Sequence, residues 1–78
     1  MDRAEIFNKV VEVTSDSLDV DASELTEQTD FKQLGADSFD LLELVTAFED
    51  EFGATMEDEK LAAITTIGDA VDAIEQAL

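Results

Sequence analysis

The sequence predicts an all-α protein, a small bundle of three longer helices and one short helix, with a long ordered loop between the first two. Apolar residues recur at helical spacing in three separate segments, which is the pattern of amphipathic helices. Residues that favour helix N-termini stand just before these segments. The 78 residues contain no Pro, no internal repeat and no linker, so we expect residues 1–78 to form one domain.

The first helix is predicted over about residues 2–17. Asp2, with Glu5 three positions later, has the arrangement of a capping box. The hydrophobic residues of this segment share one broad face. They are Ile6, Phe7, Val10, Val11 and Val13.

The loop that follows, residues 18–36, is rich in Asp, Ser and Thr, which favour turns by bonding to nearby backbone. A loop of this length is unusual in a compact domain and is normally functional or internally packed. We expect it to be ordered, with a short helical turn near residues 22–25 and with Gly35 as a positive-φ hinge at its end. Its predicted anchors are Val20, Leu25, Phe31 and Leu34.

The second helix is predicted from Ser38 to about Phe52. Asp37 is a favourable N-cap, Asp40 suits the helix dipole three positions later, and Gly53 suits the end. An apolar stripe within an arc of about 100°, the width of a core-facing surface, contains Leu41, Leu44, Val45, Phe48 and Phe52. The opposite face, which we expect to be exposed, contains Ser38, Phe39, Leu42, Glu43, Thr46, Glu49 and Asp50.

The C-terminal part of the chain predicts one short and one longer helix. A turn or two over residues 57–63 would be capped by Thr55 with Asp58 and would point Met56, Leu61 and Ile64 inward. The last helix starts at Thr66, with Asp69 as its capping-box partner. Its apolar stripe is Ile67, Val71, Ile74 and Leu78, and Ala70, Ala73 and Ala77 would permit close packing.

The charge balance excludes several classes of partner. Asp and Glu number 21 against 4 Lys and Arg, for a net charge of −17. This charge repels nucleic acid and anionic membranes, and it favours protein partners with basic surfaces. No apolar run approaches a membrane span and the acidic N-terminus does not resemble a signal peptide. We therefore expect a cytoplasmic monomer.

The residue types present argue against catalysis by the chain itself. The chain contains no His and no Cys, so it lacks the commonest general base, the commonest metal ligand and any thiolate. Nucleophilic catalysis needs a base beside the nucleophile, and the four cations are scattered along the sequence. Among 21 acids, paired carboxylates are expected by chance. We predict no catalytic residues and no metal ligands.

One segment partly resembles a calcium-binding EF-hand loop. Oxygen ligands stand at loop positions 1, 3, 5, 9 and 12, namely Asp19, Asp21, Ser23, Glu27 and Asp30. However, Glu24 occupies the position that requires Gly, and position 12 is not the usual bidentate Glu. A calcium-responsive protein is therefore retained only as an alternative, beside an acidic helical adaptor that is never modified.

Ser38 is the residue that best suits covalent modification. Serine is common at helix starts, but Asp37 already supplies the cap, which would leave the Ser38 hydroxyl on an exposed shoulder. A phosphate ester there would meet the free N–H groups at the positive end of the helix, although Asp37 and Asp40 would oppose it. From its residues alone, Ser38 is a good modification site and a poor catalytic nucleophile.

The sequence around Ser38 resembles the attachment motif of acyl carrier proteins. The motif is residues 34–40 (LGADSFD), followed by residues 42–45 (LELV). The helix end at residues 49–52 (EDEF) and the segment at residues 64–67 (ITTI) are similar to the same family, so the likeness covers the whole chain. The resemblance implies a four-helix acyl-carrier-like fold.

The resemblance also implies a function. A phosphopantetheinyl transferase would move 4′-phosphopantetheine from coenzyme A onto Ser38, and the thiol of this cofactor would carry acyl thioesters. The chain would not be an enzyme, and it would deliver its cargo to acyl-transferring and chain-elongating enzymes with basic docking patches. Family positions that meet such patches correspond to Asp37, Asp40, Glu43, Glu49, Asp50 and Glu51, and less clearly to Glu57, Asp58 and Glu59. Family positions that contact partners through apolar groups correspond to Phe39 and Leu42.

Three departures from the family pattern bear on the pathway. Phe39 stands where Leu is usual, Leu41 occupies an inward position that is often smaller or polar, and Glu57 replaces a frequent Pro. We hypothesise that Leu41 narrows the lipid cavity. The departures leave open either fatty-acid synthesis or a polyketide-like pathway, and an aminoacyl or D-alanyl carrier stays as an alternative.

Overall fold

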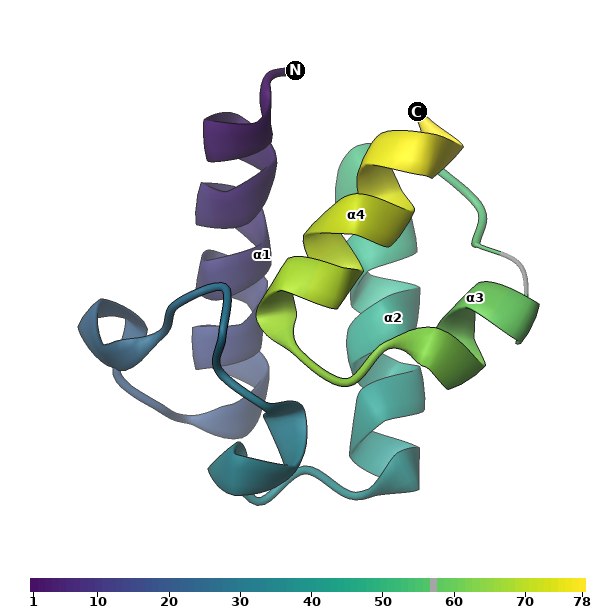
Figure 1. The fold of residues 1–78 in the computed structure, drawn as a ribbon. Coiled ribbons are helices and arrows are strands. Elements are labelled where there is room, and N and C mark those ends of the chain that lie inside the picture. The colour runs from purple at the N-terminus through teal and green to yellow at the C-terminus, as the bar shows by residue number, and fades with distance from the viewer. Residues whose placement is uncertain (57) are drawn as a thin grey trace.

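The protein is a bundle of four helices, as the sequence predicted. The computed structural model describes residues 1–56 and 58–78, without the side chains of residues 58 and 60. The helices are α1 (Arg3–Leu18), α2 (Ser38–Phe52), the short α3 (Asp58–Ala63) and α4 (Ile67–Ala77). Figure 1 shows α1 and α2 flanking α4, with α3 beyond α2 and the long loop crossing one end of the bundle. Helix α1 packs against both α2 and α4.

The helix ends follow the local rules that predicted them. The Asp2 carboxylate accepts the Glu5 N–H at 2.9 Å and begins α1. Complete capping boxes begin α2, with Asp37 and Asp40, and α4, with Thr66 and Asp69. Gly53 ends α2 with φ +63°. Helix α1 ends at Leu18, one residue after the predicted end, but its cap was not predicted, since Asp19, a residue other than Gly, adopts φ +55° there.

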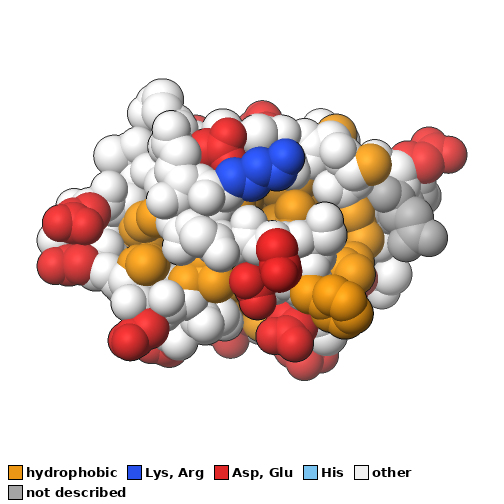
Figure 2. Space-filling view, turned by 90° about the horizontal axis from the view of Figure 1, so that it is seen from below, with side chains coloured by type: hydrophobic (Ala, Val, Ile, Leu, Met, Phe, Trp, Pro, Cys, Tyr) orange, Lys and Arg blue, Asp and Glu red, His pale blue; other side chains and the backbone are white. Residues whose placement is uncertain are grey.

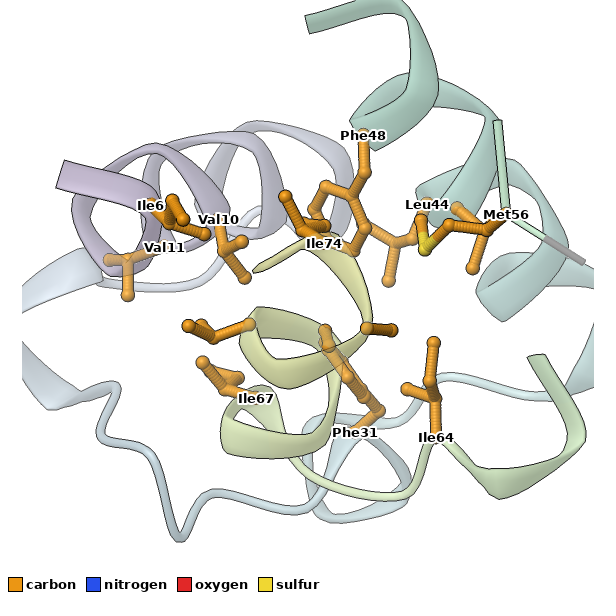
Figure 3. Close-up of a cluster of buried hydrophobic side chains, with 14 of the residues drawn as sticks. Ile6, Val10, Val11, Phe31, Leu44, Phe48, Met56, Ile64, Ile67 and Ile74 are labelled. Atoms are coloured by element: carbon orange, nitrogen blue, oxygen red, sulfur yellow. The ribbon is translucent and has the colours of Figure 1, made fainter. Parts of the chain in front are cut away.

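The core lies between α1, α2 and α4 and is closed by Phe31 from the loop (Figure 3). All but one of the stripe residues predicted on α2 are buried, and Leu41 is half-buried. On α1, Phe7 and Val13 are only half-buried, whereas Thr14, which was not predicted, is fully buried.

The prediction for Leu78 was wrong, because its side chain is 58% exposed. Helix α4 ends at Ala77, so Leu78 lies past the last helical turn and no longer follows the buried stripe. The other three members of that stripe are buried, as are Ala70 and Ala73. The small side chains therefore allow the close packing that was expected of α4.

The long loop is ordered and completes the N-terminus of α4. Its anchors are confirmed, because Leu25 and Phe31 are buried and Val20 and Leu34 are partly buried against the core. Two 3₁₀ turns occur in it, the expected one at Ala22–Glu24 and a second at Phe31–Leu34. The first amides of α4 bond to loop carbonyls, from Ile67 N–H to Thr29 at 2.9 Å and from Gly68 N–H to Glu27 at 2.9 Å. Helix N–H groups that would otherwise lack partners are thus satisfied by the loop.

Arg3 joins three separate parts of the chain. Its guanidinium pairs with Glu27 of the loop and with Asp72 and Glu75 of α4. The hydrogen bond with Glu27, followed by those with the two α4 carboxylates, raises the pKa of Arg3 further above its ordinary value. This contact links the N-terminus to the segment that covers α4.

The segment between α2 and α4 is arranged largely as expected. Met56 and Ile64 are buried and Leu61 is half-buried against the core. The short helix was predicted to start at Glu57 and to be capped by Thr55 with Asp58. Residue 57 and the side chain of residue 58 lie outside the described part of the structure, so these two points stay predictions. Across residues 1–56 and 58–78, no helix has both the length and the apolar character required to cross a bilayer.

Candidate functional site

Ser38 is the first residue of α2, and its hydroxyl is not used to cap the helix. The Asp37 carboxylate accepts the Asp40 N–H at 2.9 Å, and the Asp40 carboxylate accepts the Asp37 N–H at 3.2 Å. Ser38 is exposed, and its hydroxyl makes no hydrogen bond to any other described residue. The neighbouring acids therefore hold the helix end and leave the serine oxygen accessible.

A pocket of about 470 Å³ opens beside Ser38. Its exposed rim carries Lys32, Asp37 and Ser38, whereas Val45 and Ile64 are buried in its floor. The remaining lining residues are Asp30, Phe31, Ala36, Leu41, Leu42, Leu61, Ala62 and Thr65. Figure 2 views this end of the molecule and shows hydrophobic side chains (orange) between charged ones.

The loop places this rim by backbone hydrogen bonds. Asp30 pairs with Thr66 in an isolated antiparallel bridge, and the Phe31 N–H donates to the Thr65 carbonyl at 3.0 Å. Gly35 turns the chain with φ +86°, as predicted, and its N–H bonds to the Lys32 carbonyl at 3.0 Å. The start of α2 is thus tied to the start of α4, which the sequence pattern alone did not indicate.

The outward face of α2 combines apolar and acidic side chains near Ser38. Phe39 is 76% exposed and Leu42 is 54% exposed. Glu43 and Asp50 are also exposed, and Asp40 is half-buried beside its capping partner. Adjacent exposed apolar groups with a charged rim are typical of a docking surface.

Glu49 differs from the other acids predicted on this face. It is half-buried, and its carboxylate accepts the Met56 N–H at 2.8 Å. This contact holds the chain after α2 and occupies one oxygen that was expected to be available to partners. The sequence offered no signal for this contact, because it joins the last turn of α2 to a residue in the non-helical chain that follows the helix.

The oxygen ligands of the EF-hand-like segment have other roles. Asp21 accepts from the Ser23 N–H at 2.9 Å and from its hydroxyl at 2.8 Å, which lowers the pKa of Asp21. Asp30 accepts the Lys32 N–H at 2.8 Å, and Glu27 pairs with Arg3. Among the described residues, no group of three acids is arranged to hold a metal ion. The geometry therefore gives the calcium-responsive alternative no support.

Comparison with known proteins agrees with this geometry. A family model described as a phosphopantetheine attachment site matches residues 8–74. The chain is 45% identical over 76 residues to the acyl carrier protein of Lactobacillus acidophilus, covering 96% of this chain and 95% of that protein. It is 48% identical over 77 residues to the acyl carrier protein of Thermotoga maritima, covering 97% and 95%.

Solved structures show the same fold. An acyl carrier protein from Enterococcus faecalis superposes with a TM-score of 0.82 at 39% identity, covering all of both chains. A crystal structure of the acyl carrier protein from Thermotoga maritima gives 0.84 at 36% identity, covering 99% of this chain and 91% of that one. This chain therefore belongs to the acyl carrier protein family, and it is a non-catalytic carrier with a phosphopantetheine attachment site.

Proposed function

We propose that Ser38 is the attachment point and that the protein carries acyl intermediates of fatty-acid synthesis as thioesters. The observation that carries this proposal is the accessible Ser38 hydroxyl at the first position of α2, with its capping role taken by Asp37. When bound, 4′-phosphopantetheine supplies the thiol that a chain without Cys lacks.

The N-terminus of α2 suits a phosphodiester on Ser38. The amides of Ser38 and Phe39 have no acceptor among the described residues, and the helix dipole favours negative charge there. In the loading reaction, the Ser38 oxygen forms a bond to the phosphorus next to the pantetheine of coenzyme A. The pyrophosphate P–O bond breaks, the nucleotide bisphosphate leaves, and the serine proton passes to a base of the transferase.

We further propose that the exposed face of α2 docks the transferase and the enzymes that use the cargo. The supporting features are the apolar pair Phe39 and Leu42 at its centre and a rim of carboxylates on a chain of charge −17. The rim consists of Asp37, Asp40, Glu43 and Asp50, with Glu49 contributing its second oxygen. A basic patch on each partner would match this surface.

A polyketide-like pathway is the second candidate. The observation that favours it is Phe39, whose exposed aromatic ring replaces the Leu usual in the family, because partner recognition depends on the shape of the docked apolar group. We propose that the protein acts as a monomer in the cytoplasm in either case. Mass spectrometry of the thioesters carried in the native host separates the two pathways.

Intact-mass measurement tests the attachment site. The protein is incubated with coenzyme A, Mg²⁺ and a promiscuous phosphopantetheinyl transferase. We expect a gain of one phosphopantetheine in the wild type and in Ser17→Ala, whose serine is exposed on α1, and no gain in Ser38→Ala. Loading of Ser38→Ala, or no loading of any variant, would overturn the proposal.

Loading kinetics test the docking face with a matched pair of substitutions. Leu42 and Leu78 are similarly exposed, at 54% and 58%, but only Leu42 lies on the proposed face. We expect Leu42→Ser to lower kcat/KM for the transferase by at least about fivefold, the loss typical of a contributing interface residue, and Leu78→Ser to leave it unchanged. Equal effects of the two substitutions would contradict docking through this face.

A further inference from the structure

The pocket beside Ser38 has a mixed polar rim. Asp30 and Asp37 contribute carboxylates to its lining, and Lys32 is the one basic residue among the described residues that line it. Figure 2 shows a basic side chain (blue) on this face, next to acidic and hydrophobic groups. A basic residue therefore lines the same pocket as Ser38.

The other basic side chains that the structure describes, those of Arg3 and Lys9, already form ion pairs away from this pocket. Arg3 is bound by three carboxylates from the loop and α4, and Lys9 pairs with Glu51 between α1 and α2 at 3.4 Å. Lys32 forms no ion pair with a described residue and is exposed. Its ammonium is thus available to an anion at the pocket rim.

The backbone of Lys32 is held in place from both sides. Its N–H donates to the Asp30 carboxylate at 2.8 Å, and its carbonyl accepts the Gly35 N–H at 3.0 Å. The preceding Phe31 is 2% exposed and anchors the turn in the core. Only the flexible stem of the lysine can move, so the ammonium samples a limited region at the rim.

We propose that Lys32 is the counter-ion of the phosphodiester on Ser38 and positions the start of the bound group at the rim of the pocket. This inference rests on the proposed function. Attachment adds a negative charge beside Asp37 and Asp40 on a chain that already carries −17. A lysine ammonium binds phosphate oxygens as a point charge, and Lys32 is the cation that the fold places in the pocket shared with Ser38.

The contact is a positioning contact and not a tight bond. An exposed ion pair favours the contacted state by up to about fivefold. In about 1 M salt the screening length falls to about 3 Å, so added salt should release the contact. Lys32 therefore biases the direction in which the attached phosphopantetheine extends from Ser38, but it does not hold the phosphodiester at the pocket rim permanently.

Phosphorus NMR of the loaded protein tests this inference. Wild type, Lys32→Gln, Lys32→Arg and Lys9→Gln are loaded with coenzyme A and a transferase, and complete loading is verified by intact mass. We expect the ³¹P resonance of the phosphodiester to shift in Lys32→Gln, to stay near the wild-type position in Lys32→Arg, and to be unchanged in Lys9→Gln. Lys32→Gln and Lys9→Gln each remove one positive charge. A difference in ³¹P shift between them therefore reports the location of the lysine and not the change in net charge.

Salt gives the second readout. The difference in ³¹P shift between wild type and Lys32→Gln should disappear as NaCl is raised to about 1 M. Identical shifts in Lys32→Gln and Lys9→Gln at low salt would overturn the inference, and so would a difference that is insensitive to salt. Absence of any mass gain would instead refute the attachment to Ser38, so the two failures are distinguishable.

Discussion

The hydroxyl oxygen of Thr14 is a buried polar atom that destabilises this fold. Its side chain is fully buried on α1, and its hydroxyl has no hydrogen-bond partner among the described residues. Burying an unsatisfied hydroxyl costs about 1–3 kcal/mol in proteins. Thr14→Val replaces that hydroxyl by a methyl group and keeps the β-branched shape, so helix propensity changes little.

We therefore expect Thr14→Val to raise the free energy of unfolding by about 1–2 kcal/mol, or about 4–8 °C in Tm for each kcal/mol in a domain of this size. Urea unfolding should show a higher midpoint with an unchanged m-value. Thr14→Ser keeps the hydroxyl and removes a buried methyl, so it should lower the stability.

Thr46 provides the matched control, because it is an exposed helical threonine whose hydroxyl donates to the Leu42 carbonyl at 3.0 Å. Thr46→Val should change stability by less than about 0.5 kcal/mol. If Thr14→Val were neutral or destabilising while Thr46→Val stayed within that range, the hydroxyl of Thr14 must be satisfied and the reasoning fails.

Four further outcomes follow from the described contacts. Gly68→Ala should destabilise the fold by about 1–3 kcal/mol in thermal melts, because the added Cβ would lie 2.9 Å from the Glu27 carbonyl oxygen; an unchanged Tm would show that the loop yields. Arg3→Gln should lower Tm, by less at high salt, and a loss independent of salt would argue against the ion pairs. Hydrogen bonds from Ser23 lower the pKa of Asp21 in the fold, so its contribution is present above its ordinary value of 3.8 and is lost as the pH falls through the lowered pKa. Asp21→Asn should be less stable than wild type at pH 7, and the difference should shrink as the pH is lowered below 3.8. If Ser38 carries the phosphopantetheine as proposed, Leu41→Thr should widen the pocket and slow hydrolysis of a medium-length acyl thioester on the thiol of that group. Equal protection in wild type and variant would refute the narrowing role of Leu41.

Most of the local architecture was predictable because it depends on residues that are close in sequence. The bounds of α2, its capping box of Asp37 with Asp40, and its end at Gly53 all agree with the prediction. Capping and helical periodicity involve groups three or four residues apart, so the sequence alone identified Ser38 as an accessible hydroxyl at a helix start. The exposure of Phe39 and Leu42 followed from the same periodicity.

Contacts between distant segments were not predictable in this way. Periodicity gives the direction of a side chain around its helix, but it does not say which segment covers that side. The burial of Thr14, the bond from Glu49 to the Met56 N–H and the capping of α4 by the Thr29 carbonyl all depend on how separate elements pack.

The helix starts, and the place of Ser38 as an accessible hydroxyl at one of them, are thus determined by the local sequence, since short-range hydrogen bonds and amphipathic spacing specify them. The surroundings of that serine are not. The bridge between Asp30 and Thr66 brings the loop, α2 and the segment before α4 together. Long-range packing of those elements creates the pocket and places Lys32 in its lining with Ser38. The residues next to Lys32 in the sequence could not predict this arrangement, because it depends on where the loop packs against the segment before α4.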